Sequence, residues 1–351
     1  MKNELYLIKN KIPELSYAIT TNGVELAVLD ITHPLFISSI DEVKLKAILK
    51  RVEKTADQNA KKFNKMPAFI KNFFAKRSFI MSELVHENNT SEYLTGISTL
   101  ILKLGSNLIG KGKKRFLDRL SSRGIGGIVL RMRFRDISKI QAEALIPLLT
   151  KSPERSICFI NIAGGAASDS INTLFLIQQI NPLLLSNRSI EINVLDIDSF
   201  GPAFANSSIT ALKSSNGRFN NLDVSFKHIH YDWNDTQKLQ ELLSERKEWI
   251  QICSSEGGLF EYCSDEVIAQ NLNAIHKNSA EDIIITGSLM HDIETVDKGA
   301  IAALQISTAL KPRFLGIKGL KSIIEKTRWN LTNTIEGNPR YLIFKLVKIN
   351  K

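Results

Sequence analysis

The chain has 351 residues, of which 43% are hydrophobic and 23% charged, and its formal net charge is +10. This size and composition predict a folded globular protein of one large or two smaller domains, and they exclude a disordered or fibrous chain. The three cysteines are too few and too irregularly spaced for a disulfide framework or a closed zinc site, which fits a reducing compartment.

The positive charge is confined to the N-terminal part. Residues 1–150 hold 25 Lys and Arg against 14 Asp and Glu, whereas residues 151–351 hold 21 against 22. A basic surface can attract nucleic acid, an anionic lipid surface or an acidic substrate, and it can equally be the solvated face of lysine-rich helices. The nearby phenylalanines recur at near-helical spacing, which favours packing against a core over stacking on bases: Phe63, Phe69, Phe73 and Phe74.

The first residues, MKNELYLIKN, contain no secretory apolar core. No apolar run reaches the ~18 residues that a membrane span needs. We therefore expect a cytoplasmic protein without a membrane span.

The N-terminal part is predicted to be mainly helical. Apolar residues recur at helical spacing over 43–59, 97–108 and 137–149. The basic segment GKGKK closes the second of these stretches as a turn. The three glycines that follow predict a hinge: Gly124, Gly126 and Gly127.

We therefore divide the chain into a basic helical region over 1–125 and a second domain over 126–351. The first region is expected to fold over the second as a lid and to build the substrate pocket. Residues 91–98, SEYLTGIS, are a candidate wall of that pocket.

From residue 157 onward, short apolar runs alternate with helix-length amphipathic segments, which predicts strands buried on both faces and covering helices. We expect strands at 157–163, 191–195, 224–229, 249–253 and 283–286, with helices at 169–180, 207–213, 236–246, 265–276 and 298–310. Two β-rich runs at 328–335 and 340–347 predict a terminal hairpin. The predicted fold is α/β: a doubly wound, mostly parallel seven-stranded sheet with a C-terminal antiparallel hairpin, plus a helical N-terminal extension.

The first predicted strand runs into small residues, INIAGGAASDS over 160–170. Doubly wound sheets bind ligands at the carboxyl ends of their strands, and small residues let a ligand approach the backbone. Ser168 or Asp169 is the expected N-cap of the next helix, whose free N–H groups can bind an anion. A G-x-G-x-x-G dinucleotide site does not fit, because alanines occupy or displace its glycines.

The run instead resembles the first motif of class I S-adenosylmethionine-dependent methyltransferases, acidic-x-Gly-x-Gly-x-Gly. In that register Asn161 stands at the acidic position, Ala163 at the first glycine, Gly165 at the second and Ala167 at the third. The resemblance implies that the cofactor S-adenosylmethionine lies against this loop, with Gly164 beside it.

The next two strand ends extend the resemblance. Asp196 ends a strand about 30 residues after the glycine pair, and one carboxylate accepts two hydrogen bonds from the vicinal hydroxyls of a ribose. By resemblance Asp196 binds the ribose and Ile197 packs on the adenine. Asp232 and Trp233, after the third strand, would contact the adenine. A strand-end acid that caps a turn and a core tryptophan are the structural alternatives.

The fourth strand leads into CSSEGGLFEY over 253–262, which resembles the Ser/Ala-Glu-Gly…Tyr segment of the carboxyl- and small-molecule O-methyltransferase branch. It does not resemble the Asn/Asp-Pro-Pro-aromatic motif of amino-methylating nucleic-acid enzymes. The resemblance assigns Ser254, Ser255 and Glu256 to the cofactor. Tyr262 is assigned to the catalytic site, with a core aromatic as the alternative.

Arg131 and Arg133 lie upstream in LRMRFRD. An arginine upstream of the core holds the cofactor's carboxylate in the leucine carboxyl methyltransferase branch, and guanidinium geometry suits this role. Either residue is therefore a candidate for it, and a surface arginine is the alternative.

Methyl transfer from a sulfonium needs an acceptor atom in line with the methyl carbon, so positioning supplies much of the acceleration. A general base is needed only when the acceptor must lose a proton. His291 is the candidate base, with Asp292 or Glu294 to orient it, and an exposed loop histidine is the alternative. No residue cluster has the spacing of a metal site.

These features predict a methyltransferase that acts on an oxygen or nitrogen atom of a small-molecule acceptor, with a homodimer left open. A second hypothesis is an RNA or protein methyltransferase that docks its target on the basic N-terminal region. A third is a catalytically inactive relative that only binds S-adenosylmethionine or another nucleotide.

Overall fold

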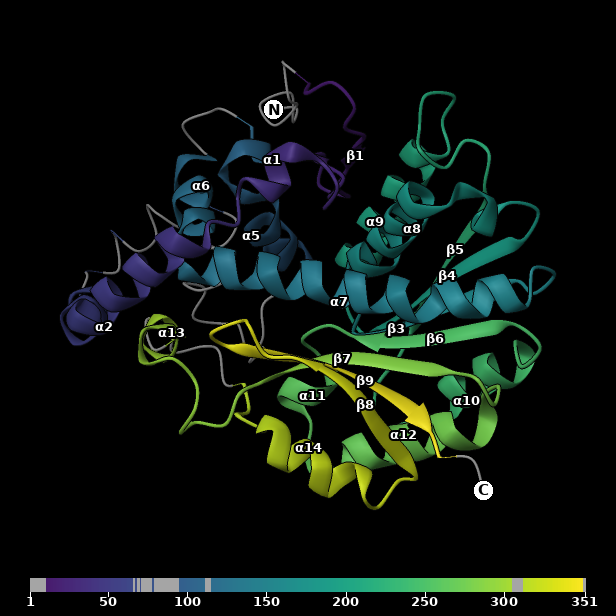
Figure 1. The fold of residues 1–351 in the computed structure, drawn as a ribbon. Helices are drawn as coiled ribbons and strands as arrows, with labels where there is room; N and C mark the ends of the chain where they lie inside the picture. The colour runs from purple at the N-terminus through teal and green to yellow at the C-terminus, as the bar shows by residue number, and fades with distance from the viewer. Residues whose placement is uncertain are drawn as a thin grey trace.

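A seven-stranded sheet forms the centre of the computed structural model, which describes residues 11–65, 67, 70, 78, 95–110, 115–304 and 312–349. Its strands follow the order β5-β4-β3-β6-β7-β9-β8 (Figure 1). The five strands from β3 to β7 are parallel, and β9 pairs antiparallel with both β7 and β8. The bounds are β3 (Ile157–Ile162), β4 (Ser189–Asp196), β5 (Asp223–His230), β6 (Ile250–Ser255), β7 (Ile284–Met290), β8 (Trp329–Ile335) and β9 (Tyr341–Lys348).

This sheet confirms the predicted fold, the five parallel strands and the terminal hairpin. Every residue of β3, β6 and β7 is buried, because helices cover both faces of the sheet. Strand order reverses between β3 and β6, which are parallel neighbours. The carboxyl ends of these two strands therefore form the position where such folds bind ligands.

Two groups of helices sandwich the sheet, one on each face (Figure 1). The first group is α7 (Ile125–Lys151), α8 (Ser168–Ile180) and α9 (Phe200–Leu212). The second group is α10 (Gln237–Glu245), α11 (Leu259–Tyr262), α12 (Asp265–Asn278) and α14 (Gly316–Ile324). Helix α13 (Lys298–Leu304) packs against α2, and the 3-10 turn η3 (Pro182–Leu185) follows α8. Each helix predicted after residue 157 is present, although α9 begins earlier than expected.

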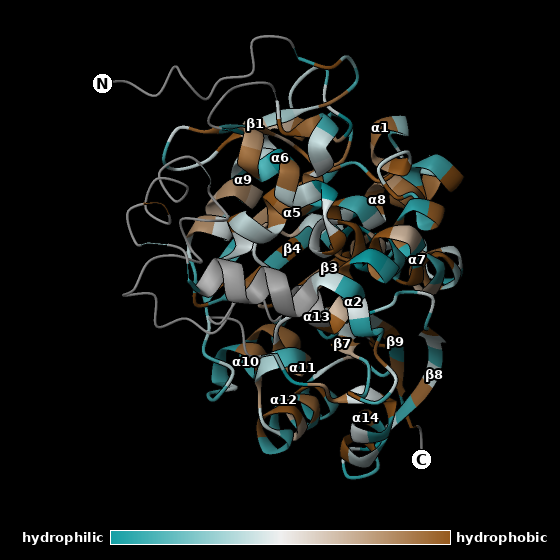
Figure 2. Cartoon of the chain, turned by 90° about the vertical axis from the view of Figure 1, so that its left-hand side faces the viewer, coloured by the Kyte–Doolittle hydropathy of each residue, from teal (hydrophilic) through white to brown (hydrophobic). Residues whose placement is uncertain are grey.

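The N-terminal part contributes α1 (Pro34–Ile37), α2 (Glu42–Asn64), α5 (Gly96–Leu108) and α6 (Phe116–Arg123). It also contains a hairpin of β1 (Tyr17–Ile19) and β2 (Glu25–Ala27), which the sequence pattern did not predict. Its apolar residues form one continuous core with α7, α8 and one face of the sheet. Figure 2 shows hydrophobic residues on α5, which packs against both α6 and α9.

The predicted glycine hinge is wrong at Gly126 and Gly127, and only Gly124 separates two helices, α6 and α7. Gly124 is the N-cap of α7, and the helix continues unbroken through Gly126 and Gly127 to Lys151. Helix α7 packs against α5 and α6 on one side and against α8 and the sheet on the other. Burial of its side chains therefore outweighs the ~1 kcal/mol that each interior glycine costs.

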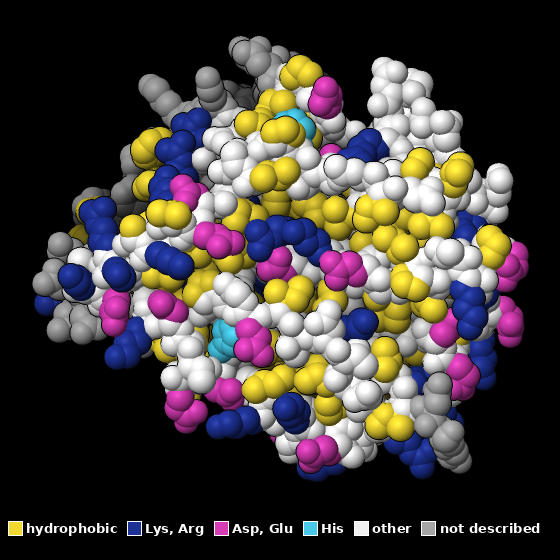
Figure 3. All heavy atoms as spheres, in the orientation of Figure 1, with side chains coloured by type: hydrophobic (Ala, Val, Ile, Leu, Met, Phe, Trp, Pro, Cys, Tyr) yellow, Lys and Arg dark blue, Asp and Glu magenta, His cyan; other side chains and the backbone are white. Residues whose placement is uncertain are grey.

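Several predicted features lie partly or wholly outside the described residues: the side chain of Phe63, residues Phe69, Phe73 and Phe74, most of the GKGKK segment, residues 91–94, and the predicted helix beyond Leu304. Of the basic residues that are described, Lys44, Lys46 and Lys50 are exposed on α2. Lys and Arg side chains gather over this helix at the left edge of Figure 3. Within the described ranges, every helix is too short or too polar to cross a lipid bilayer.

Three glycine backbones from distant parts of the chain meet beside the carboxyl end of β3. A Cβ atom at Gly201 would lie 2.8 Å from the Cα and carbonyl carbon of Gly165, and one at Gly96 would lie 3.1 Å from the same Cα. Backbone atoms cannot yield as a flexible side chain can. The first turns of α5 and α9 therefore approach the loop after β3 only because these positions carry no side chain.

We expect Gly201→Ala to lower the free energy of unfolding by about 1–2 kcal/mol, because overpacking against backbone exceeds the gain in helix propensity. Gly126→Ala is the matched control, since a Cβ there meets no atom within 4 Å. It should leave stability unchanged or raise it. Denaturant unfolding of the two variants measures both effects, and equal stabilities would contradict the close contact.

Candidate functional site

The loop between β3 and α8 has an unusual backbone. Ala163, Gly165 and Ala167 all have left-handed conformations, with φ of 53°, 49° and 51°. This region is unfavourable for alanine, so the surrounding structure must hold the loop in place. Gly164 must also be glycine, because a Cβ there would overlap the side chain of Asn161. Ala163 and Gly164 remain partly exposed.

Asp196 holds this loop from the neighbouring strand. Its Oδ2 atom accepts a hydrogen bond from the Gly165 amide at 2.9 Å, and its Oδ1 atom accepts one from the Asp198 amide at 2.9 Å. Each carboxylate oxygen keeps a second acceptor position. Burial raises the pKa of Asp196, and the two amides oppose this rise. The half-buried carboxylate thus lies at the carboxyl end of β4, as predicted.

Two large apolar side chains follow Asp196 on the surface. Ile197 is 53% exposed and Phe200 is 54% exposed. Phe200 was missed because the predicted helix began at residue 207, whereas α9 begins at Phe200 itself. An exposed aromatic ring and an exposed isoleucine near a strand-end acid offer flat apolar surface to a ligand.

Asp232 and Trp233 follow the end of β5, the strand next to β4. Asp232 is exposed, and its Oδ1 atom accepts hydrogen bonds from Asn234. Trp233 is partly buried against the core, and its carbonyl accepts a hydrogen bond from Asn271. Both residues therefore lie at the same edge of the sheet as Asp196.

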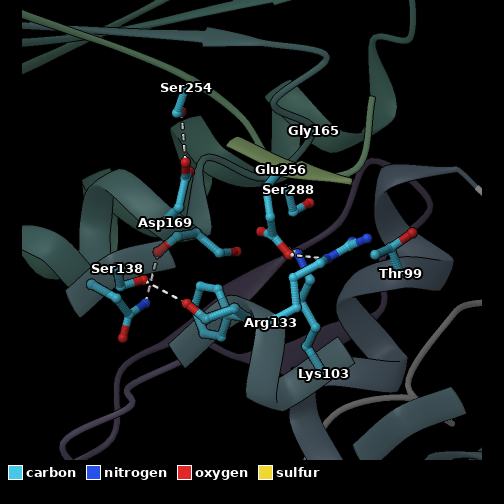
Figure 4. Close-up of polar contacts among 12 residues, drawn as sticks. Thr99, Lys103, Arg133, Ser138, Gly165, Asp169, Ser254, Glu256 and Ser288 are labelled. Carbon is cyan, nitrogen blue, oxygen red and sulfur yellow. Dashed lines mark hydrogen bonds and ion pairs between the residues drawn. The ribbon is translucent and has the colours of Figure 1, made fainter. Parts of the chain in front are cut away.

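A buried polar network underlies the reversal of strand order (Figure 4). Asp169 is 3% exposed, and its carboxylate accepts hydrogen bonds from Asn161 at 2.9 and 3.0 Å, from Ser254 at 2.7 Å and from Gln141 at 3.1 Å. Asn161 and Ser254 are opposite each other on β3 and β6. Burial raises the pKa of Asp169, and Glu256 adds to this rise.

The predicted N-cap of α8 is wrong for both candidates. The N-cap is Ala167, which makes no side-chain capping bond, and α8 begins at Ser168. Asp169 instead points into the network because its carboxylate is the acceptor for three buried donors. Asn161 and Ser254 act here as partners of Asp169, and Ser255 accepts a hydrogen bond from the Leu259 amide.

A chain of buried charges crosses the end of β6 (Figure 4). Lys103 Nζ lies 2.7 Å from Glu256 Oε2, and Arg133 Nε lies 3.2 Å from Glu256 Oε1. Arg133 Nη1 continues the chain to Glu261 Oε1 at 2.8 Å, and the guanidinium lies 4.4 Å from the ring centroid of Tyr341. Lys103 belongs to α5, and sequence reasoning did not select it.

The ion pairs set the charge states of Arg133 and Glu261. Burial raises the pKa of Glu261, and Arg133 opposes the rise. Burial opposes the charge of Arg133, but the two glutamates and Tyr341 outweigh it and raise its pKa. Arg133 is therefore a permanent cation at the end of β6.

Arg131 has a different environment, although it is only two residues away. It is 2% exposed and donates hydrogen bonds to the carbonyls of Ser39, Leu102 and Ser122. Burial lowers its pKa to about 10. All three partners belong to the N-terminal part, so Arg131 joins three N-terminal segments to α7. Arg133 is the arginine that contacts Glu256.

His291 directly follows β7, and Tyr262 is the last residue of α11. His291 Nε2 lies 2.9 Å from the Asn338 carbonyl. A carbonyl only accepts, so Nε2 is the donor, and in the neutral imidazole Nδ1 is then an acceptor. Asp292 lies against Gly316 at the start of α14. Tyr262 is half-buried on α11, and burial raises its pKa.

The cysteines and acids do not form a metal site within the described part of the chain, where no group of three His, Cys, Asp or Glu could hold an ion. The free cysteines are buried: Cys158, Cys253 and Cys263. Burial raises the pKa of Cys158 to about 12, which makes its thiol unreactive at neutral pH.

Comparison with known proteins identifies this fold elsewhere. A family model described as a STAS-like domain of unknown function (DUF4325) matches residues 173–235. No curated protein matches the chain significantly. The solved structure of a possible exported protein from Bordetella parapertussis aligns over 87% of this chain and 96% of that chain, with 12% identity and a TM-score of 0.53. The chain therefore shares its fold with that protein, and at this identity the likeness extends to the fold alone.

Two methyltransferase structures from Burkholderia thailandensis align with lower scores. One is 1,6-didemethyltoxoflavin-N1-methyltransferase with bound 1,6-didemethyltoxoflavin and S-adenosylhomocysteine, at 12% identity over 62% of this chain and 79% of that chain, with a TM-score of 0.39. The other is an O-methyltransferase family protein, at 10% identity over 66% of this chain and 61% of that chain, with a TM-score of 0.41.

Proposed function

We propose that this chain is an S-adenosylmethionine-dependent methyltransferase that acts on an oxygen or nitrogen atom of a small-molecule acceptor. The proposal rests on the surroundings of the Asp196 side chain. Asp196 is the last residue of β4, and its carboxylate accepts a hydrogen bond from the Gly165 amide, beside the point where strand order reverses. The exposed side chains of Ile197 and Phe200 follow it in the chain. A carboxylate can accept hydrogen bonds from the two vicinal hydroxyls of a ribose, and apolar side chains can pack on an adenine ring. Together they suit an adenosine.

The amino-acid half of the cofactor would lie at the end of β6. Glu256 offers a carboxylate to its ammonium, and Arg133 offers a guanidinium to its carboxylate. The partly exposed backbone of Ala163 and Gly164 lies between this end and Asp196. Bound S-adenosylmethionine would supply an activated methyl group on its sulfonium.

The acceptor would lie on the side of His291 and Tyr262. The tautomer of His291 set by the Asn338 carbonyl leaves Nδ1 able to take a proton from a hydroxyl acceptor. Helix α5 would exclude water, since its first turn packs on Gly165 and Gly201. A division at residue 125, a cytoplasmic location and a homodimer stay predictions.

The exposed lysines of α2 favour one alternative, in which the acceptor is RNA and the N-terminal region docks it. Such binding would weaken steeply with salt. Salt-dependent RNA binding that is lost when Lys44, Lys46 and Lys50 are replaced by glutamine would favour this alternative over a small acceptor.

Calorimetry with S-adenosylhomocysteine, 5′-methylthioadenosine and NAD⁺ tests the cofactor. We expect both adenosyl ligands to bind at one site and NAD⁺ to bind far more weakly. Transfer of labelled methyl from S-adenosylmethionine to a panel of phenols, carboxylic acids and amines then tests the reaction. If neither adenosyl ligand binds, the proposal is wrong.

A further inference from the structure

Helix α5 contacts the proposed cofactor site at two points. Its first residue, Gly96, lies on Gly165, and Lys103, two turns later, reaches Glu256. Lys103 is the only charged residue of the apolar segment GISTLILKLGSNL. A buried lysine on an otherwise uncharged helix needs a specific partner, and here that partner is a glutamate that the proposed function assigns to the ligand.

The surroundings of the Lys103 ammonium resemble a site for a ligand cation. The side chains of Lys103 and Glu256 are 9% and 7% exposed, and their charged atoms lie 2.7 Å apart. The ammonium also lies 5.2 Å from the ring centroid of Phe134. A carboxylate and an aromatic ring are two of the groups that bind ammonium ions in proteins. Glu256 already has a second cation in Arg133, so it carries two positive partners.

From this geometry, and resting on the proposed function, we infer that Lys103 is a built-in competitor for the ammonium of the cofactor. Its Nζ atom lies 2.7 Å from Glu256 Oε2, the carboxylate oxygen that would otherwise bind the ligand's ammonium. The amino-acid half of the ligand binds only when Lys103 moves away, and Lys103 therefore sets the affinity for adenosyl ligands that carry an α-amino group.

The exchange involves the lysine side chain and leaves the helix in place. Arg131 holds the carbonyl of Leu102 at 3.0 Å, and the contact of Gly96 with Gly165 fixes the first turn. Helix α5 is interrupted at Gly105, where φ is 71°, so the pinned segment ends just after Lys103. The four-carbon stem of lysine can swing while this backbone stays fixed.

The test compares two ligands that differ in the amino-acid half. S-adenosylhomocysteine carries the α-amino group, and 5′-methylthioadenosine lacks it. We expect Lys103→Met to bind S-adenosylhomocysteine roughly tenfold more tightly than the wild type, because Glu256 loses a competing charge-assisted bond. The affinity for 5′-methylthioadenosine should change less than about twofold, within ordinary additivity error. Lys103→Arg, which retains a cation, should bind both ligands as the wild type does.

Further variants complete the calorimetric experiment. Lys139→Met removes an exposed lysine of α7 and should bind both ligands as the wild type does. In a Glu256→Gln background, Lys103→Met should no longer tighten S-adenosylhomocysteine binding, because the shared carboxylate is gone. Lys103→Gln serves the same purpose as Lys103→Met if thermal unfolding shows that the latter is not folded.

The outcomes separate this inference from the proposed function. Unchanged or weaker binding of S-adenosylhomocysteine to both Lys103→Met and Lys103→Gln, with wild-type binding intact, overturns the competitor role and leaves the methyltransferase proposal standing. Equal tightening of both ligands also overturns it, since the effect would then not depend on the ammonium. Failure of the wild type to bind either adenosyl ligand overturns the proposed function itself.

Discussion

Asp196→Ala is expected to weaken the binding of S-adenosylhomocysteine by about 1–3 kcal/mol, a loss of roughly fivefold to more than a hundredfold. The loss has two sources, since the carboxylate would bond the ribose hydroxyls and also bonds the Gly165 amide. Without it, the left-handed backbone at Gly165 loses a hydrogen bond that holds it beside the ligand. Isothermal titration calorimetry of purified wild type and variant measures the change.

Asp223→Ala is a matched control for that experiment. Asp223 begins β5, at the opposite edge of the sheet from Asp196, and accepts a hydrogen bond from Ser189 at 2.6 Å. The control removes the same functional group from an adjacent strand, so it should leave the affinity for S-adenosylhomocysteine unchanged. Equal affinities of wild type and Asp196→Ala, with both proteins folded, would contradict the assignment of Asp196 to the ribose.

The fold from residue 157 onward could be predicted from the sequence because burial on both faces leaves a simple pattern. A strand such as β3 reads as a continuous apolar run, and the helix between two such strands reads as an amphipathic segment of matching length. The N-terminal part was harder. Strands β1 and β2 have three residues each, too few for alternation to show.

The start of α7 was predicted too late, at residue 137 instead of Ile125, because of the glycines before Ile128. Local propensity favours a break at Gly124–Gly127, whereas the packing of α7 against segments both before and after it favours a helix. Those tertiary contacts are not visible in a local window of sequence. The same limit applies to Asp169, whose buried partners lie on three other elements.

The candidate site was predictable where residues follow strand ends directly. The resemblance selected Asp196, Ile197 and Glu256, and their positions at one edge of the sheet follow because parallel strands bring their carboxyl ends together. Their role in binding stays a prediction. Lys103 was not found, because its partner lies 153 residues away in the chain. One signal was available, since a lone lysine in an apolar helix must have a buried counter-charge or leave the core.

Asp169→Ala is expected to lower the free energy of unfolding by about 3 kcal/mol or more. The substitution removes the acceptor that Asn161, Ser254 and Gln141 share, and each donor N–H or O–H left unsatisfied costs about 1–3 kcal/mol. Asn161 keeps a hydrogen bond to Ser254, and Gln141 keeps one to Thr286. Denaturant unfolding at pH 7 measures the change. A loss below about 1 kcal/mol would show that water or rearranged partners replace the carboxylate.

Asp169→Asn separates the charge of this residue from its hydrogen bonds. An asparagine oxygen at the Oδ2 position can still accept from Gln141 and Ser254, so most of the network persists. Burial raises the pKa of Asp169 in the folded protein above the ~3.9 of an unfolded aspartate. Between these two pKa values the folded state binds more protons than the unfolded state, so wild-type stability falls as pH rises through that window.

The variant has no carboxyl group at this position and lacks that contribution. The stability of Asp169→Asn relative to the wild type should therefore rise as pH increases above about 4 and become constant above the folded pKa. Other carboxyls with raised pKa values, such as Asp196 and Glu261, titrate in both proteins and cancel in the difference. Urea unfolding of both proteins from pH 4 to 9 gives the difference directly. Parallel profiles would mean that Asp169 titrates alike in the folded and unfolded states, and that the network carries no buried charge penalty.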